Sequence, residues 1–272
     1  MQGQLSKMTC RAEAQVQYTL DLGSDTQDMN ALIGKPIRLE FLQKIICQHC
    51  GRKTNKSFSQ GYCYPCFTSL AACDLCIMSP DCCHFHLGTC RDNTFAEQFC
   101  MQPHRVYLAN STGLKVGITR AENLPSRWLD QGATQGLVIM TASTRRQSGL
   151  IEAALKAHVS DRTQWQRMLK GPGEILDLPA ERDRLLALAA DAISAIQAEF
   201  EPGAMAVAET AETMRFDYPV TQYPEKVKSY NLDKTPVLEG TLLGIKAQYL
   251  ILDHTVINLR KYTGYEVSLN TI

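Results

Sequence analysis

The sequence predicts an α+β protein in which the two chain ends form a small β-sheet or barrel and the middle is inserted between them. Three observations lead to this prediction. Both ends have strand-like patterns, ten of the eleven cysteines lie between Cys47 and Cys100, and short strands and helices follow them. We therefore expect a β domain from residues 1–46 plus 215–272, a double zinc module over 47–104, an α/β domain over 105–170 and an acidic helical segment over 171–214.

The composition is typical of a folded protein. Of 272 residues, 44% are hydrophobic and 21% are charged, which is enough apolar mass for one or two cores. No run approaches the roughly 18 apolar residues that a transmembrane helix needs, and residues 1–17 lack the apolar centre of a signal peptide. We therefore expect a cytoplasmic protein without a membrane partner, whose clustered cysteines stay reduced and bind metal.

The terminal strands are predicted from apolar alternation and turn residues. Strands are expected over Gln15 to Leu22, Ile37 to Ile46, Val237 to Leu243, Gln248 to Leu252 and Val256 to Lys261. Asp253 and His254 form a tight turn between the last two. Neither end has an obvious core of its own, so we expect the two ends to pair with each other.

The first four cysteines have the spacing of a zinc ribbon. Cys47-x2-Cys50 is followed, after twelve residues, by Cys63-x2-Cys66. Four thiolates complete the tetrahedral coordination of structural zinc. A redox role would require a thioredoxin-like strand and helix around the motif, and that context is missing. The spacing therefore predicts a structural zinc site.

A second zinc site is predicted from Cys73-x2-Cys76, with several candidates for the remaining ligands. These are Cys82, Cys83, His84, His86, Cys90 and Cys100. The most compact set is Cys73, Cys76, Cys83 and Cys90, and Cys100 competes for either of the last two places. A catalytic zinc is the alternative, because His84 and Asp92 lie nearby, but cysteine-rich ligand sets are more often closed structural sites.

A zero net charge conceals a basic segment beside an acidic one. Residues 105–170 contain 10 Lys/Arg and 4 Asp/Glu, whereas residues 171–214 contain 2 and 9. This asymmetry indicates either a local anion site or an internal pairing of the two segments. Arg145 and Arg146 are expected on a solvated face, unless they line the same cleft as Arg127.

The basic segment is predicted to be a hairpin followed by helices. Strands are expected over Arg105 to Ala109 and Lys115 to Thr119. Helices are expected from Ser148 through Val159 and from Asp161 through Lys170, and an amphipathic helix over Glu181 to Phe200 accounts for the acidic segment.

Two family resemblances rest on particular residues. The central segment resembles the GIY-YIG nuclease superfamily at Val106-Tyr107-Leu108, Lys115-Val116-Gly117-Ile118-Thr119, Arg127-Trp128 and Glu152. Nearly the whole chain resembles a bacterial domain-of-unknown-function family, number 2797. That resemblance rests on Gln60-Gly-Tyr-Cys-Tyr-Pro-Cys-Phe, Cys90-Arg-Asp, Leu114-Lys-Val-Gly-Ile-Thr-Arg, Arg127-Trp-Leu-Asp-Gln-Gly-Ala and Gly244-Ile-Lys-Ala-Gln-Tyr-Leu.

The GIY-YIG resemblance implies a phosphodiesterase site. In that superfamily a hairpin carries two tyrosines, one helix an arginine and a later helix a glutamate that holds a divalent metal. Tyr107, Arg127 and Glu152 match, whereas Lys115 replaces the second tyrosine and the late asparagine has no match. The resemblance therefore implies Tyr107, Lys115, Arg127 and Glu152 as catalytic residues, with Mg²⁺ or Mn²⁺ at Glu152. A lysine binds phosphate as a point charge but is a poor general base unless its pKa is depressed.

Three functions agree with the sequence. The chain is a nuclease acting on DNA or RNA, a non-catalytic nucleic-acid-binding protein, or a zinc-stabilised scaffold that binds a protein partner through the acidic helix. Structural roles compete with each site residue: Tyr107 as a core aromatic, Gly117 as a bulge or close-packing position, and Glu152 as the ion-pair partner of Lys156 on an exposed helix face.

Overall fold

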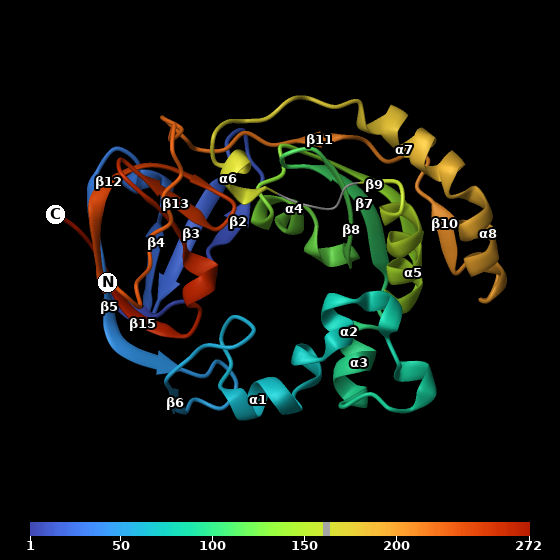
Figure 1. Ribbon diagram of the computed structural model, residues 1–272, viewed down its shortest axis with the longest axis horizontal. Coiled ribbons are helices and arrows are strands. Elements are labelled where there is room, and N and C mark those ends of the chain that lie inside the picture. Colours follow the sequence, from blue (N-terminus) through green and yellow to red (C-terminus); the bar gives the residue numbers. More distant parts are fainter. Residues whose placement is uncertain (160–163) are drawn as a thin grey trace.

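The computed structural model describes residues 1–159 and 164–272. It contains three antiparallel sheets of seven, five and three strands, with helices between them (Figure 1). This confirms the mixed α and β character expected from the sequence. The terminal strands lie on one side of the molecule, the central sheet on the other and the cysteine-rich helices below (Figure 1).

The two chain ends share the seven-stranded sheet. Its strands run in the order β1 (Gln2–Gln4), β15 (Tyr265–Thr271), β5 (Pro36–Ile46), β12 (Val237–Lys246), β13 (Tyr249–Leu252) and β14 (Val256–Asn258), and β6 (Lys53–Thr54) pairs with β5. Leu39 of β5 lies opposite Leu238 on one side and Leu269 on the other. From Ile37 to Phe41, alternate residues of β5 are buried, as the period of a half-buried strand requires.

A three-stranded sheet packs on the same apolar core. It consists of β2 (Thr9–Arg11), β3 (Gln17–Leu22) and β4 (Asp25–Asp28), and the 3₁₀ helix η1 (Asn30–Leu32) follows. The expected strand through Lys261 instead ends at Asn258 and continues as the 3₁₀ helix η6 (Leu259–Tyr262). The reason is local: the Asn258 side chain accepts a hydrogen bond from the Arg260 backbone N–H and starts a turn.

The cysteine-rich residues form short helices that connect the two larger units (Figure 1). In chain order these are α1 (Tyr64–Ser69), η2 (Ala71–Cys73), α2 (Leu75–Met78), η3 (Pro80–Cys82), η4 (Phe85–Leu87) and α3 (Asn93–Phe99). The side chains of Asp74 and Asp92 cap α2 and α3.

The central sheet has the order β10 (Met205–Val207), β9 (Gln135–Ala142), β7 (His104–Asn110) and β8 (Leu114–Arg120), and β11 (Met214–Arg215) also pairs with β9. The hairpin of β7 and β8 lies where the sequence predicts it. The strand β9 was not predicted, although its continuous apolar run from Leu137 to Met140 is typical of a buried strand. Between β8 and β9 lie η5 (Ala121–Asn123) and α4 (Ser126–Asp130).

The helix α5 (Arg145–Lys156) begins earlier than expected. Thr144, not Ser148, caps it, because Thr144 and Gln147 form a reciprocal capping box. The helix expected to start at Asp161 has its start outside the described residues, and α6 spans Trp165–Met168.

The acidic segment forms two helices instead of one. These are α7 (Leu178–Leu188) and α8 (Ala190–Ala198), and the non-helical backbone of Ala189 separates them. Leu185, Ala189 and Ile193 pack into the apolar core of the central sheet. No helix in the described residues is both long and apolar enough to cross a membrane.

Candidate functional site

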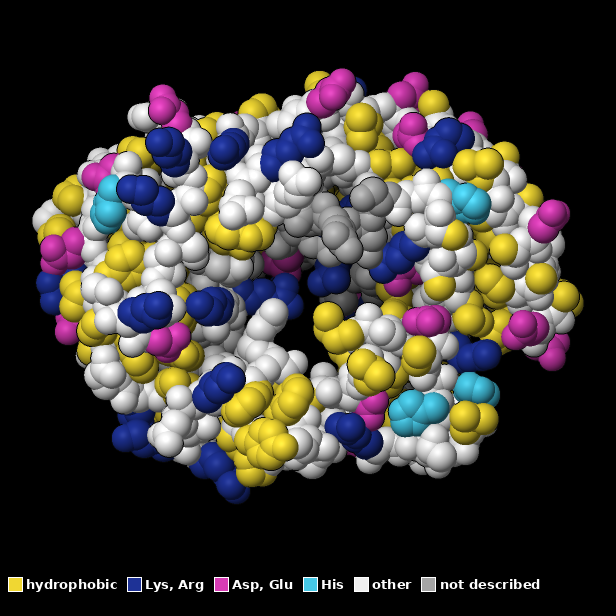
Figure 2. Space-filling view, in the orientation of Figure 1, with side chains coloured by type: hydrophobic (Ala, Val, Ile, Leu, Met, Phe, Trp, Pro, Cys, Tyr) yellow, Lys and Arg dark blue, Asp and Glu magenta, His cyan; other side chains and the backbone are white. Residues whose placement is uncertain are grey.

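A cavity of about 560 Å³ lies where the terminal β unit, the cysteine-rich helices and the central sheet meet. The four residues implied by the GIY-YIG resemblance, Tyr107, Lys115, Arg127 and Glu152, all line it. Figure 2 shows the hollow at the centre of the molecule, with Lys and Arg side chains around it. Residues far apart in the sequence therefore face one space.

The cavity is strongly basic. Seven of its lining residues are cationic and two are acidic, a difference of five positive charges; they are Lys7, Lys115, Arg120, Arg127, Arg145, Lys156 and Arg260, with Asp130 and Glu152. Lys7 pairs with Asp130, at 2.6 Å between Nζ and Oδ2. A concave surface with an excess of one charge concentrates its field and favours ligands of the opposite charge. The cavity is therefore suited to anions.

Tyr107 is held by the strand opposite it and by α4. It lies across from Gly117 in the hairpin, and a Cβ on Gly117 would lie 2.6 Å from both Cζ and Oη of the Tyr107 ring. Its hydroxyl donates to Gln131 Oε1 at 3.2 Å, and its ring meets Trp128 edge-on at 5.8 Å. Gly117 thus provides room for the Tyr107 ring. This role differs from both expected ones, a bulge and close helix packing.

The chemistry of the Tyr107 hydroxyl follows from its surroundings. Burial raises the pKa of Tyr107, and the neighbouring Arg127 partly opposes this rise. The phenol therefore stays protonated at neutral pH. In this state it is a hydrogen-bond donor and not a base.

Glu152 belongs to the face of α5 that is turned toward the cavity. It is only 8% exposed, although its expected ion pair with Lys156 is present, at 3.2 Å between Oε1 and Nζ. Within residues 1–159 and 164–272, no group of three potential metal ligands includes Glu152. A divalent ion there would be bound by one carboxylate together with waters and a substrate phosphate, as Mg²⁺ commonly is.

Arg145 lies between the cavity and the cysteine-rich helices and not on a solvated face. It is 9% exposed, and its Nη2 donates to the carbonyl of Ile77 at 2.6 Å. Because Thr144 caps α5, Arg145 lies in its first turn, next to α2. One turn later, a Cβ on Gly149 would lie 2.6 Å from the backbone of Pro80 and Asp81. The helix that carries Glu152 is therefore packed directly on the cysteine-rich unit.

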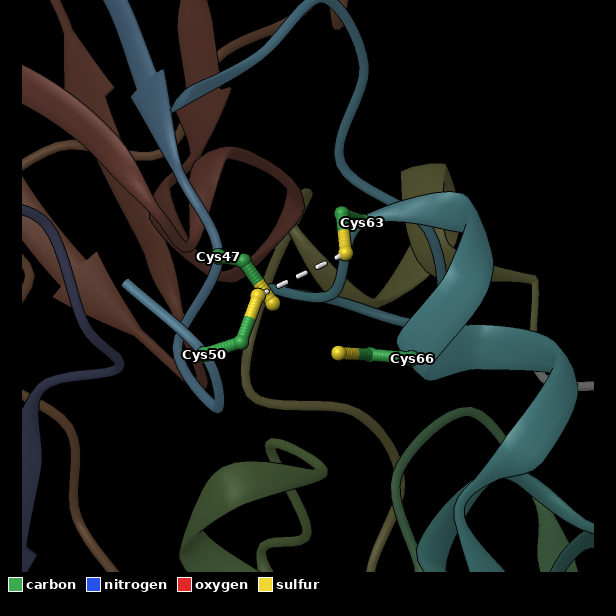
Figure 3. A group of neighbouring side chains, drawn as sticks. All are labelled: Cys47, Cys50, Cys63 and Cys66. Atoms are coloured by element: carbon green, nitrogen blue, oxygen red, sulfur yellow. Dashed lines mark hydrogen bonds between the residues drawn. The ribbon is translucent and has the colours of Figure 1, made fainter. Parts of the chain in front are cut away.

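The first four cysteines form the cluster that the spacing predicts (Figure 3). The sulfur atoms of Cys47, Cys50, Cys63 and Cys66 lie within 4.8 Å of one another, and those of Cys50 and Cys63 are 3.7 Å apart. Zn–S bonds of about 2.3 Å in a tetrahedron separate the sulfurs by about 3.8 Å. The four cysteines can therefore hold a zinc ion.

Local backbone geometry supports the first cluster. Cys47 directly follows β5, and Cys63 lies at the N-cap of α1. Although burial raises the pKa of Cys47, backbone N–H groups of Cys50, Cys63 and His49 lower it to about 6. Hydrogen bonds of this kind favour the thiolate, which is the form that binds metal.

The later cysteines gather differently from the expected set. A second, small cavity is lined by Cys76, Cys83, Cys90 and Cys100, together with His84, whereas Cys73 is not among its lining residues. A hydrogen bond from the Cys100 thiol lowers the pKa of Cys83 to about 6. Asp74, Cys76 and His84 also have ligand atoms within 4.8 Å of one another.

The position of Cys73 has a backbone cause. Cys73 ends η2, Asp74 is extended with φ −66° and ψ 154°, and a new helix then begins. The two cysteines of the Cys73-x2-Cys76 motif therefore belong to different helices. Burial raises the pKa of Cys73, and a hydrogen bond with the Ser59 side chain opposes the rise. Cys73 thus contacts the segment between the first two cysteine pairs.

Sequence reasoning missed several cavity residues. Lys7 and Arg260 belong to the terminal unit, at opposite ends of the chain, and Arg120 lies at the end of β8. No local pattern distinguishes them from other surface cations. Only the pairing of the chain ends brings Lys7 and Arg260 to the cavity.

Comparison with known proteins identifies the family of the chain. No curated protein and no solved structure matches the chain. A family model with the description "Protein of unknown function (DUF2797)" matches residues 34–267, which is well over half of the chain. The chain therefore belongs to the DUF2797 family.

Proposed function

We propose that the protein is a zinc-stabilised nucleic-acid-binding protein whose central cavity receives the phosphate backbone of DNA or RNA. The observation that carries this proposal is the excess of cations, seven against two acidic residues, on the walls of one cavity. Phosphate contacts by Lys and Arg dominate the affinity of proteins for nucleic acids. A concave basic wall concentrates such contacts on one stretch of backbone.

The origin of the cations supports a clamp-like binding site. Lys115 and Arg127 come from the central unit, whereas Lys7 and Arg260 come from the terminal unit. A phosphate chain inside the cavity would therefore meet positive charge on two sides. The first cysteine cluster lies directly after β5, so its zinc would fix the connection between the two walls.

Cleavage of the bound backbone is a second candidate function, favoured by one specific arrangement. The four residues Tyr107, Lys115, Arg127 and Glu152 line the cavity from β7, β8, α4 and α5 in turn. This is the order of hairpin, helix and later helix that the GIY-YIG resemblance implies. Arg127 would stabilise charge that develops on the phosphate, and Lys115 would hold a neighbouring phosphate oxygen.

Glu152 and Tyr107 would have different roles in hydrolysis. Glu152 would bind a divalent ion, which supplies Lewis acidity and a water of lowered pKa. The raised pKa of Tyr107, caused by burial, makes its hydroxyl a hydrogen-bond donor to the phosphate or to the attacking water. The lysine at position 115 therefore need not act as the base.

Fluorescence anisotropy with labelled single-stranded and duplex DNA and RNA tests the binding proposal. We expect the affinity to fall as salt rises, because phosphate contacts release counterions. Arg127→Ala should reduce both the affinity and the salt slope. Arg38→Ala is the matched control, because Arg38 lies in the terminal sheet and pairs with Glu40, at 3.1 Å, outside the cavity. No binding at low salt, or equal loss in both variants, would refute the proposal.

Incubation of the same nucleic acids with Mg²⁺ or Mn²⁺ tests cleavage separately. We expect Glu152→Gln to abolish cleavage while binding persists, because the variant loses the metal ligand and keeps the cations. Intact substrates with both metals, under conditions where binding is measured, would eliminate the second candidate and retain the first. Cleavage by Glu152→Gln at the wild-type rate would remove Glu152 from the mechanism.

A further inference from the structure

We propose that Cys76, Cys83, Cys90 and Cys100 form a second, four-thiolate zinc site. All four line one small cavity that is separate from the basic cavity. No three of their sulfur atoms lie within 4.8 Å of one another, unlike those of the first cluster, so the thiolates would draw together on the ion. They come from α2, from the residue after η3, from the turn before α3 and from the end of α3. One ion would thus join the three short helical segments that pack against one another here.

The cavity fits an ion and little else. Its volume is about 10 Å³, roughly the size of one water-sized sphere, and apolar side chains including Ile77, Phe95 and Ala96 form much of its wall. Cys76, Cys83 and Cys100 are at most 7% exposed. A dry, enclosed group of soft sulfur ligands selects zinc over magnesium or calcium. These features are those of a closed structural site.

Asp74 and His84 have other partners close to this site. Asp74 Oδ2 pairs with Arg91 Nε at 2.7 Å, and Asp74 Oδ1 accepts from the Cys76 backbone N–H at 3.4 Å. His84 Nδ1 hydrogen-bonds with Thr89 Oγ1 at 2.8 Å. These contacts fix the loop that carries Cys83 and the turn that carries Cys76. His84 Nε2 faces Asp74 Oδ1 at 3.8 Å, and four thiolates already complete a tetrahedral zinc site, so we assign Asp74 and His84 to the surroundings of the metal.

The proposed site has a consequence for the basic cavity. Ile77, next to Cys76, accepts the hydrogen bond from Arg145, and Pro80 packs on Gly149 of α5. A metal that fixes α2 and η3 would therefore fix one wall of the cavity as well. This effect is structural and is independent of whether the cavity binds nucleic acid.

The metal content of the intact protein is the first test. Native mass spectrometry of protein purified from zinc-supplemented medium should show two zinc ions per chain, and a single ion would overturn the proposal. Cys73→Ser should retain two ions, whereas Cys83→Ser and Cys100→Ser should retain one. Cys90→Ser should retain one ion, whereas His84→Ala should retain two. Two ions in Cys90→Ser together with one in His84→Ala, or loss of an ion by Cys73→Ser, would also overturn the proposal.

A second measurement avoids variants, in case Cys→Ser changes prevent folding. The native wild-type protein is alkylated with iodoacetamide, with and without prior chelation, and the modified cysteines are mapped. Cys90 is only half-buried and Cys82 is exposed, so burial alone protects neither. We expect Cys82 to be modified in both samples and Cys90 only after chelation. Modification of Cys90 in the zinc-loaded protein would refute its role as a ligand.

Discussion

The terminal β unit and the central unit bury different kinds of side chain. Of the twelve buried polar or charged residues among those described, nine lie between His104 and Glu152, and three, Lys246, Gln248 and Thr255, belong to the terminal unit. Buried polar groups reduce stability unless they are hydrogen-bonded. An interior with many of them therefore indicates a role beyond stabilising the fold. Here the unit with the polar interior also supplies most of the basic cavity. The contrast separates a unit with an almost wholly apolar interior from a unit whose polar residues lie beside the basic cavity.

Hydrogen bonds of the polar interior also attach the acidic segment. Asn110 Nδ2 donates to the carbonyl of Glu174 at 2.6 Å, and Gln135 Nε2 donates to the carbonyl of Leu176 at 2.8 Å. Gln135 Oε1 accepts from the Leu176 backbone N–H at 2.8 Å. The acidic segment is therefore joined to β7 and β9 by amide side chains, and it packs as part of the central unit.

Lys246 is the clearest exception to the apolar interior of the terminal unit. Replacing it should have the largest effect on stability, seen in its pH dependence. It is fully buried, donates to the Gly171 carbonyl at 2.8 Å, and burial lowers its pKa from 10.5 to about 8. Between pH 8 and pH 10.5 the unfolded chain binds more protons than the folded protein, so stability should rise with pH. Lys246 alone should contribute a rise of about 3 kcal/mol, which appears as the difference between the wild-type and Lys246→Met profiles.

Urea unfolding at pH 7 to 10.5 measures this rise. Lys246→Met should lack it, because the variant has no buried amine to titrate. Lys226→Met, at an exposed position, should keep the wild-type profile. A variant Lys246→Met with an unchanged profile would show that other groups cause the pH dependence.

Gly149→Ala should weaken the packing of α5 against the cysteine-rich unit and lower the stability of the protein. The new Cβ would lie 2.6 Å from backbone atoms of Pro80 and Asp81, which cannot move aside cheaply. We expect a loss of about 2 kcal/mol, with overpacking exceeding the helical preference for alanine. Chemical denaturation measures the loss. Gly171→Ala is the control, since its Cβ would have no atom within 4 Å, and equal stability of the two variants would contradict the packing argument.

Gly117→Ala should have a smaller effect, confined to the cavity wall. Its Cβ would displace the Tyr107 ring, which Trp128 confines from another side, and we expect a cost of about 1–2 kcal/mol. A double-mutant cycle with Tyr107→Leu measures the coupling, because the smaller side chain relieves the contact. Additive effects of the two changes would disprove direct contact as the cause.

Arg260→Gln should have the smallest effect and tests whether the terminal unit contributes to binding. On the proposed function, we expect three- to tenfold weaker nucleic-acid binding, at most about 1.4 kcal/mol, and a salt slope lower by about one. Anisotropy titrations compare it with Arg127→Gln, which should lose more. An unchanged affinity for Arg260→Gln would confine binding to the central unit.

The sequence contains much of the fold and part of the site. The close pairs Cys47–Cys50 and Cys63–Cys66 follow from spacing, because each pair lies in one short backbone turn. The grouping of the later cysteines does not follow from spacing, since η2 and α2 place Cys73 and Cys76 on different helices. Lys7 and Arg260 reach the cavity only through long-range strand pairing. Arg145 lines the same cavity as Arg127, which is the alternative that the sequence left open, because the capping box of Thr144 and Gln147 places Arg145 in the first turn of α5.

The pairing of the chain ends determines the order in which the protein can fold during synthesis on the ribosome. β5 lies between β12 and β15, so Leu39 and its neighbours emerge long before either partner strand exists. The three strands β7, β8 and β9 are close in sequence and can associate early, whereas the terminal sheet must wait for almost the whole chain. During that interval, the apolar face of β5 stays exposed to solvent and to non-native contacts.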